Sequence, residues 1–364
     1  MILNILHLAR TMGQGGAEKI IFQLASGCNS IENKIVVASC GGVYVDALKQ
    51  KNICHYQVHD LECKNPWIIL QTLVKLAKVV KKERIQMIHS HHRMAALYGR
   101  ILKCFFPKLK LVYTAHNVFE DKARLTKMAL SDTEIVAVGE SVKNNLMEVF
   151  QIEEDRITTI FNAVDIQEEE WQHPLLQGLK EQGNTLIGII GRLSEQKGMD
   201  LFIKAIGPLT KKYPMVKGII VGDGEKREEL QALVKQSELE ASIYFLGYQE
   251  HVTAIIKQLD FAAMPSRWEG FPLTPIEIFA MEKTLVAADI GGINEIVEDG
   301  RNGLLVPKNN EKQLSEAMEL LLLDIELRQQ LEQQAKIDYN ENYSYQSFLE
   351  NYLHFYQTIK DTFL

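Results

Sequence analysis

The 364-residue chain has no apolar run that approaches the roughly 20 residues needed to span a bilayer, so no membrane-spanning helix is expected. It begins Met1-Ile-Leu-Asn-Ile-Leu-His-Leu, a stretch without basic residues that is typical of a strand, and we expect no signal peptide. Low-complexity segments and short repeats are also lacking. With 46% hydrophobic and 24% charged residues, the composition is that of a soluble globular protein and excludes disordered, collagenous and coiled-coil classes.

Cysteine is scarce, and its placement is irregular. The five cysteines all lie in the first half and include no Cys-x-x-Cys pair: Cys28, Cys40, Cys54, Cys63 and Cys104. An odd set without a leader predicts reduced thiols in the cytoplasm. No Cys and His residues have the spacing of metal ligands, so we expect no metal. The nearest candidate is His89-Ser90-His91-His92, and alternating histidines at a strand end more often serve hydrogen bonding.

The charge is acidic overall but unevenly distributed. A net charge of −7 disfavours nucleic acid as a partner. Residues 1–165 carry 21 Lys+Arg and 16 Asp+Glu, whereas the remainder carries 19 and 31. The basic residues gather in two segments, 75–84 and 100–110, and the second also holds Leu102, Phe105 and Phe106. Basic side chains beside exposed aromatics would suit an anionic membrane surface. The alternative is chance variation of surface charge, with both phenylalanines buried in a helix end.

Short β-rich apolar runs alternate with longer helical patterns along the whole chain. Strands are expected at 3–8, 34–39, 87–89, 111–114, 134–138 and 157–160, then at 186–190, 216–221, 243–245, 261–264, 284–287 and 303–305. Helices are expected at 17–26, 68–83, 200–209, 226–236, 275–281 and 311–339. This alternation predicts an α/β protein with two doubly wound parallel sheets, each binding ligands at the carboxyl ends of its strands. The polar stretch Ile166–Asn184 is the expected joint, and spaced aromatics from Tyr345 to Ile359 predict a final helix packed on a core.

Two loops have the composition of anion-binding sites. The first, Gly13-Gln14-Gly15-Gly16-Ala17-Glu18, follows the first strand and opens a helix. It is not a dinucleotide fingerprint, because Glu18 stands where a third glycine belongs, which disfavours a nicotinamide-dependent oxidoreductase. The second loop carries Arg192 and Lys197 between Gly191 and Gly198. This pair of cations suits a diphosphate, although two solvated surface cations are the alternative.

The strongest signal is the segment Pro265–Glu277, which follows an expected strand. Glu269 falls in its loop and Glu277 in the first turns of the next helix, so both carboxylates can accept hydroxyl groups of a sugar or ribose. Acids near helix N-termini are also common for purely structural reasons. The turn Gly222-Asp223-Gly224-Glu225 is interpreted as a nucleotide-edge contact rather than a metal-binding pair.

In combination these motifs resemble glycosyltransferase family 4, the retaining nucleotide-sugar enzymes of the GT-B fold, over nearly the whole chain. The matching segments are Gly15-Gly16-Ala17-Glu18, His89-Ser90-His91, Thr114-Ala115-His116-Asn117, Asn162-Ala163-Val164-Asp165, Gly191–Gly198, Val221–Gly224, Glu269 with Glu277, and Gly291-Gly292 with Glu295 and Gly303. The resemblance implies two Rossmann-like domains facing a central cleft. It implies an acceptor-side domain of residues 1–166 with the C-terminal helix 344–364 returning to it, and a donor-binding domain of residues 167–343.

The resemblance also implies a role for each matching residue. The implied catalytic residues are His116, Glu269, Arg192 and Lys197. Arg192 and Lys197 would neutralise the donor diphosphate in place of a metal, so no cofactor is expected. Glu277 would hold the ribose, and Glu269 the donor sugar. The rest of the implied donor site is Gly15, Gly16, Gly222, Asp223, Gly270, Phe271, and the amides of Leu273 and Thr274, with His91, His116 and Asn117 on the acceptor side.

The expected reaction is retaining transfer of a hexose or N-acetylhexosamine from a nucleotide-diphosphate sugar, with UDP favoured, to a hydroxyl of a glycan or lipid-linked acceptor. Such a transfer would serve cell-surface polysaccharide or glycolipid synthesis, in the cytoplasm or peripherally at the inner face of the membrane. A nucleotide-sugar epimerase or phosphorylase, and a non-catalytic nucleotide-sugar-binding protein of the same fold, are the alternatives.

Overall fold

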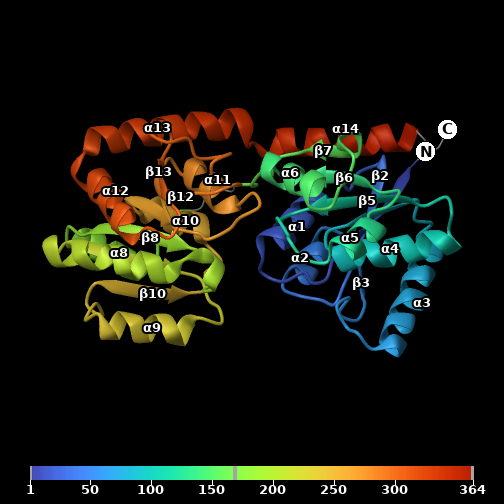
Figure 1. The fold of residues 1–364 in the computed structure, drawn as a ribbon, viewed down its shortest axis with the longest axis horizontal. Helices are drawn as coiled ribbons and strands as arrows, with labels where there is room; N and C mark the ends of the chain where they lie inside the picture. Colours follow the sequence, from blue (N-terminus) through green and yellow to red (C-terminus); the bar gives the residue numbers. More distant parts are fainter. Residues whose placement is uncertain (1, 167–169, 362–364) are drawn as a thin grey trace. The chain divides into compact units, whose positions relative to one another are not determined.

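The computed structural model describes residues 2–166 and 170–361, and the chain divides into two compact units (Figure 1). Unit 1 comprises Met1–Ala163 with Tyr345–Leu364, and unit 2 comprises Val164–Ser344. Of the expected joint, Glu168 and Glu169 lie outside the described residues. In the rest of the expected joint, helix α7 (Pro174–Glu181) occupies the centre and buries Leu176 and Leu179 in unit 2.

Unit 1 contains a seven-stranded, fully parallel sheet in the order β3-β2-β1-β4-β5-β6-β7. Its strands are β1 (Leu3–Leu8), β2 (Asn33–Ser39), β3 (Cys54–Gln57), β4 (Met87–Ser90), β5 (Lys110–Ala115), β6 (Glu134–Ala137) and β7 (Ile157–Thr159). The predicted strands are confirmed to within one residue or two at their ends. The strand β3 was not predicted, because its sequence Cys-His-Tyr-Gln has no apolar run; it lies at the sheet edge with an exposed residue at each end.

The helices of unit 1 are α1 (Gly16–Cys28), α2 (Tyr44–Gln50), α3 (Pro66–Lys82), α4 (Arg93–Phe105), α5 (Ala123–Ala129), α6 (Glu140–Glu148) and α14 (Tyr345–Asp361). Helix α3 starts where Pro66 occupies the first turn and the Asn65 side chain accepts the Trp67 amide. The C-terminal helix α14 packs on unit 1, as predicted. Its aromatic face is buried, and the Tyr345 hydroxyl donates to the Gln23 carbonyl on α1 at 2.9 Å.

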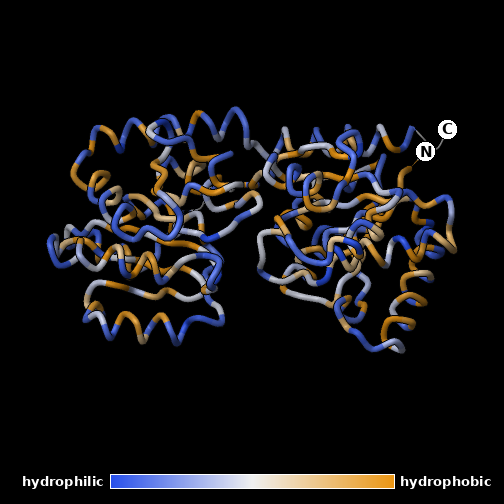
Figure 2. The backbone as a smooth tube through the Cα atoms, in the orientation of Figure 1, coloured by the Kyte–Doolittle hydropathy of each residue, from blue (hydrophilic) through white to orange (hydrophobic). Residues whose placement is uncertain are grey.

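Unit 2 contains a six-stranded parallel sheet in the order β10-β9-β8-β11-β12-β13. Its strands are β8 (Thr185–Ile190), β9 (Val216–Val221), β10 (Ile243–Gly247), β11 (Phe261–Met264), β12 (Leu285–Asp289) and β13 (Leu304–Pro307). The helices besides α7 are α8 (Met199–Lys212), α9 (Arg227–Gln236), α10 (Val252–Gln258), α11 (Leu273–Ala280), α12 (Glu311–Leu323) and α13 (Ile325–Asn342). Figure 2 shows the apolar strands inside this unit and the hydrophilic outer turns of α9 and α13.

The single helix predicted over 311–339 is wrong, since the chain breaks at Asp324 into α12 and α13. Asp324 leaves the helical conformation with ψ of 87°, and its carboxylate accepts the Leu327 amide to cap α13. The helical spacing of apolar residues continues across this break, so the spacing alone could not predict that two helices are present. An aspartate followed by a helix-compatible stretch is a typical N-cap.

In both sheets the strand order reverses beside the first strand of the unit, between β1 and β4 in unit 1 and between β8 and β11 in unit 2. The carboxyl ends of strands at such a reversal are where doubly wound sheets bind ligands. The loops that leave these four strands carry most of the predicted site residues. Among the described residues, no helix combines the length and the hydropathy needed to cross a membrane.

Candidate functional site

The predicted site residues form two groups, one in each unit. In unit 2 the loops that follow β8 and β11 pack directly on each other. Gly198 has a φ of 66°, and a Cβ at this position would lie 2.1 Å from the carbonyl oxygen of Pro265. Only glycine fits this close approach of two backbones, which explains why a glycine follows Lys197. The turn holds Lys197 beside the segment that carries Glu269.

Lys197 and Glu269 are in direct contact. The Lys197 ammonium lies 2.6 Å from Oε1 of Glu269, and the Gln196 amide donates to the other carboxylate oxygen at 3.3 Å and to the Trp268 carbonyl at 2.8 Å. Glu269 is only 6% exposed. The two residues expected at the donor diphosphate and the donor sugar are therefore neighbours, although 72 positions separate them in the sequence.

A second ion pair, absent from the sequence predictions, joins the same two loops. The Arg267 guanidinium binds both carboxylate oxygens of Asp200 at 3.0 and 2.8 Å and donates to the Glu195 carbonyl at 2.7 Å. The hydrogen bond to Asp200 holds the pKa of Arg267 above its usual value. This bidentate ion pair joins the loop after β11 to the start of α8. Arg267 lies inside the strongest motif, so its position was the one signal that could have identified it.

Helix α11 starts at Leu273, two residues earlier than predicted, with Pro272 as its N-cap. The amides of Leu273 and Thr274 therefore belong to its first turn, where backbone N–H groups have no acceptor within the helix. Such amides form an anion-binding helix end. Glu277 lies one turn further along α11 and is buried, as is Phe271 in the preceding loop. Gly270 is buried in the same loop.

The remaining donor-side residues lie after β8 and β9. Gly222 has a φ of 130°, and a Cβ there would lie 1.9 Å from the Gly191 carbonyl oxygen. The Asp223 carbonyl accepts the Leu193 amide at 3.0 Å, and its carboxylate bonds the Gly224 amide and the Arg227 guanidinium, so Asp223 is part of a turn. The Arg192 side chain is exposed at the same edge of the sheet.

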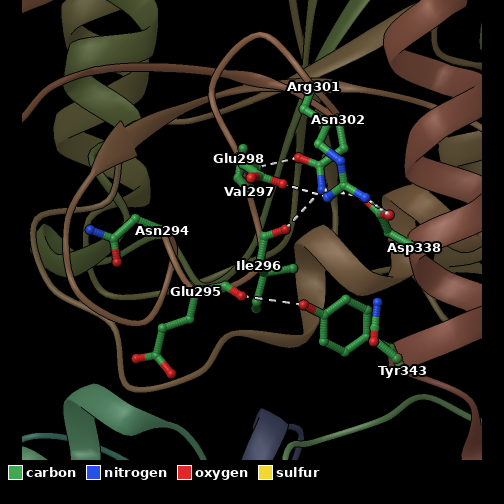
Figure 3. Close-up of a pocket in the computed structure, with 10 residues that line it drawn as sticks. Asn294, Glu295, Ile296, Val297, Glu298, Arg301, Asn302, Asp338 and Tyr343 are labelled. Carbon is green, nitrogen blue, oxygen red and sulfur yellow. Dashed lines mark hydrogen bonds and ion pairs between the residues drawn. The ribbon is translucent and has the colours of Figure 1, made fainter.

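A polar pocket of about 200 Å³ lies in the same unit, between α13 and the segment after β12 (Figure 3). Arg301 binds Glu298 and Asp338, and the Asn302 amide donates to Asp338 at 2.7 Å. The Tyr343 hydroxyl donates to the Glu295 carbonyl at 3.3 Å, and its ring lies 6.1 Å from that of Phe271. These contacts connect the end of α13 to the loop that carries Glu269, and we interpret them as structural support for that loop.

The group in unit 1 centres on histidines at the carboxyl ends of β1, β4 and β5. His91 lies 3.1 Å from His116 and 2.9 Å from His7, measured between ring nitrogens. His7 was not predicted. It lies within a largely apolar strand, and the sequence alone does not show that it sits opposite His89 in the register of β1 and β4. Asn117 accepts the Val118 amide at 2.9 Å, while Gly15 and Gly16 are the N-cap and first residue of α1.

Burial keeps these histidines uncharged. It lowers the pKa of His7 to about 3 and that of His116 to about 4. Burial, and to a smaller extent the neighbouring histidines, also hold the pKa values of His89 and His91 well below the usual value. At neutral pH each ring therefore has one nitrogen that can donate a hydrogen bond and one that can accept a hydrogen bond.

The rings of His7, His89 and His91 also bring nitrogen atoms within 4.8 Å of one another, a spacing that could hold a metal ion. Both nitrogens of His89 are already hydrogen-bonded, to Tyr356 at 2.6 Å and to Thr114 at 2.7 Å. A metal would have to displace these partners in a fully buried position. The donor set therefore fits a hydrogen-bond network better than a metal site.

Comparison with known proteins gives matches along nearly the whole chain. Residues 14–168 match the family model for Glycosyltransferase Family 4, and residues 176–338 match that for Glycosyl transferases group 1. An uncharacterized glycosyltransferase of Methanocaldococcus jannaschii is 27% identical over 326 residues, which cover 85% of this chain and 86% of that protein.

Two further proteins are similar over most of their length. The N-acetylgalactosamine-N,N'-diacetylbacillosaminyl-diphospho-undecaprenol 4-alpha-N-acetylgalactosaminyltransferase of Campylobacter jejuni is 25% identical over 350 residues, covering 90% of this chain and 92% of that protein. The crystal structure of Anabaena HepE in complex with UDP-glucose superposes with a TM-score of 0.86 at 21% identity, over 98% of this chain and all of the other. The fold described above is therefore the same as that of a protein whose structure was determined with a bound nucleotide sugar.

Proposed function

We propose that this chain, which belongs to glycosyltransferase family 4, transfers a sugar from a UDP-sugar to a hydroxyl of a glycan or lipid-linked acceptor with retention of configuration. That it is a GT-B glycosyltransferase follows from the family matches. The donor and acceptor classes are supported by the relatives, one a complex with UDP-glucose and one named for a diphospho-undecaprenol acceptor. The observation that carries the proposal is the Lys197–Glu269 pair beside the start of α11.

The chemistry follows from the charges at this edge of the unit 2 sheet. Arg192 and Lys197 offer two cations, and the amides of Leu273 and Thr274 two more donors, to the diphosphate of the donor. Together they stabilise the negative charge that grows on the phosphate as it leaves, which is the role we assign to them in place of a metal. Glu277 accepts hydrogen bonds from the ribose hydroxyls, and Glu269 from the sugar.

In the proposed step the acceptor oxygen forms a bond to the anomeric carbon while the bond from that carbon to the phosphate oxygen breaks on the same face of the sugar. The acceptor proton passes to the departing phosphate oxygen, so the nucleoside diphosphate leaves with the charge balanced. This front-face route is preferred because no carboxylate is assigned as a covalent nucleophile. His116 of unit 1 contributes a hydrogen bond on the acceptor side.

The test uses the full chain with UDP-hexoses and UDP-N-acetylhexosamines, with ADP- and GDP-sugars as controls. A donor present at 100 times its Kd should stabilise the fold by about 2.7 kcal/mol, read as a thermal shift. Transfer to a glycan acceptor is then followed, and NMR of the product linkage gives the anomer. Retention supports the proposal. An inverted anomer contradicts it, and release of an altered sugar from the donor alone identifies an epimerase instead.

We further propose that the enzyme works in the cytoplasm and binds the inner face of the membrane through α3. Trp67, Leu70 and Val74 form one exposed face of this helix, and Trp67 is 74% exposed. Figure 2 shows α3 as a strongly apolar helix at the edge of unit 1. Four exposed lysines follow on the same helix: Lys75, Lys78, Lys81 and Lys82. Such a helix suits an anionic bilayer surface.

The second basic segment contributes less than its sequence suggested. Phe105 is 74% exposed at the end of α4, but Leu102 is buried and Phe106 is half-buried against the core. The expectation of exposed aromatic side chains is therefore confirmed for Phe105 and wrong for Phe106. Leu102 belongs to the core cluster on which α4 packs, and Phe106, the residue after α4, lies against the same cluster.

Replacing Trp67, Leu70 and Val74 together by serine is expected to weaken binding to vesicles containing anionic lipid at least tenfold, since burying each side chain contributes about 1.5–3 kcal/mol. Sedimentation with vesicles of neutral lipid, and of neutral plus anionic lipid, measures it. The matched control replaces Leu320 and Leu323, exposed apolar residues of α12, by serine. Failure of the unmodified protein to bind either vesicle would contradict the assignment.

A further inference from the structure

Three histidines of unit 1, His7, His91 and His116, form a continuous chain of hydrogen-bonded ring nitrogens, of which the proposed function uses only His116. We propose that His7 and His91 are positioning residues that fix which nitrogen of His116 carries the proton, and that α14 holds this chain in place. The consequence for sugar transfer rests on the proposed function, whereas the chain itself is testable on the resting protein.

The links of the chain all have the same direction. Nδ1 of His7 lies 2.9 Å from Nε2 of His91, and Nδ1 of His91 lies 3.1 Å from Nε2 of His116. A neutral imidazole has one N–H and one bare nitrogen. Once one link has a donor and an acceptor, the polarity of the next is therefore determined. The rings belong to three strands that are adjacent in the sheet, so the chain runs along its carboxyl edge.

Only two arrangements satisfy both links. In the first, every proton is on Nδ1, so that His7 donates to His91 and His91 donates to His116. In the second, every proton is on Nε2 and the direction is reversed. They differ at the buried end: among the described residues Nε2 of His7 has no hydrogen-bond partner, and the side chain is fully buried.

The buried end decides between the two arrangements. The second would leave an N–H of His7 without an acceptor, a rarer defect in protein interiors than an acceptor with an unused lone pair. The first leaves only a bare ring nitrogen. We therefore assign the proton of His116 to Nδ1, where it can be donated to an oxygen of the substrate. His116 is then a hydrogen-bond donor and not a base.

Two tyrosines of helix α14 hold the ring of His89, which packs against this chain of histidines. The Tyr356 hydroxyl lies 2.6 Å from Nδ1 of His89, and the other nitrogen of His89 lies 2.7 Å from the Thr114 hydroxyl, which is 3.2 Å from the Tyr352 hydroxyl. With both nitrogens held, the His89 ring stacks on His91 at 4.2 Å between centroids. The C-terminal helix thus fixes the orientation of a ring that packs against the central member of the chain.

The first experiment is ¹⁵N NMR of histidine-labelled full-length protein at pH 7, with the His116 signals assigned by their loss in His116→Asn. We expect His116 protonated at Nδ1 and bare at Nε2. Protonation at Nε2 would overturn the assignment. In His7→Leu, which removes the first donor at similar side-chain volume, the two tautomers of His116 should become mixed. An unchanged Nδ1 tautomer there would overturn the positioning role.

The second experiment measures transfer. Loss of one oriented hydrogen bond should lower kcat about tenfold in His7→Leu and in Tyr356→Phe, with the KM for the donor nearly unchanged. His116→Asn, whose amide can donate near the position of Nδ1, should keep more activity than His116→Ala. The matched control is Tyr345→Phe, which removes from the same helix a hydroxyl that donates to the Gln23 carbonyl.

The two proposals fail differently. If the unmodified protein transfers no sugar, the proposed function fails, and the NMR result still decides the chain. If it transfers sugar while Tyr356→Phe and Tyr345→Phe have the same kcat, the role of α14 is overturned. Tyr356→Phe also covers the case in which His7→Leu does not fold, because it leaves all the histidines in place.

Discussion

Replacement of Lys197 by alanine is expected to lower the rate of sugar transfer by about 10²–10³, the usual cost of losing one preorganised electrostatic donor. The ammonium lies on a short turn that the backbone contact of Gly198 with Pro265 holds in place. In the proposed site it would therefore meet the leaving phosphate without reorganisation. The measurement is kcat at saturating donor, and Arg192→Ala is expected to lose at least as much if both cations bind the diphosphate.

The control for this prediction separates chemistry from folding. Lys197→Ala leaves Glu269 as a buried carboxylate without its ion-pair partner, which can destabilise the fold. Thermal unfolding of each variant must therefore be compared with its activity. Lys212→Ala, which removes an ammonium paired with Glu319 on an exposed part of unit 2, should keep full activity. Near-normal turnover in a folded Lys197→Ala protein would remove Lys197 from the diphosphate site.

Local sequence suggested the chemistry that we propose for the donor side, but it could not predict the contacts observed there. The types and spacing of Arg192, Lys197, Glu269 and Glu277 indicated phosphate and hydroxyl binding before any fold was known. The contact between Lys197 and Glu269 depends on β8 and β11 being adjacent, which is a property of strand order and not of either motif. The same reason hid Arg267 from prediction, because its partner Asp200 lies on a helix 67 positions away.

The histidine group of unit 1 was harder to predict, because the residues that build it resemble core residues. His7 lies within an apolar strand, and Tyr352 and Tyr356 lie on a helix whose aromatic spacing is fully explained by packing. Each tyrosine does pack, yet its hydroxyl also reaches a histidine or threonine of the sheet. Periodicity identifies which face of an element is buried. It does not show which polar atoms meet inside, since that depends on elements far apart in the chain.

Acidification from pH 7 to pH 5 is expected to destabilise unit 1 by several kcal/mol, through the same histidines. In the unfolded chain these residues have their ordinary pKa of about 6.5. In the fold, burial lowers the pKa to about 3 for His7 and to about 4 for His116. The unfolded state therefore binds more protons below pH 6.5, and stability falls as the pH decreases from there towards the folded pKa values.

The size of the effect follows from the interval between pH 6.5 and pH 5, which is worth about 2 kcal/mol for each histidine that stays neutral in the fold. His7 and His116 both meet that condition, and His89 and His91 act in the same direction. Acid destabilisation is measured separately in each unit by amide hydrogen exchange at the two pH values, corrected for the intrinsic exchange rate.

Peptides from β1, β4 and β5 should lose protection, while β8 and β11 of unit 2 serve as the internal control. His7→Leu should reduce the loss by about 2 kcal/mol, because it removes one of the buried groups that the unfolded state protonates. Equal loss of protection in both units would show that the buried histidines do not control the acid sensitivity of unit 1.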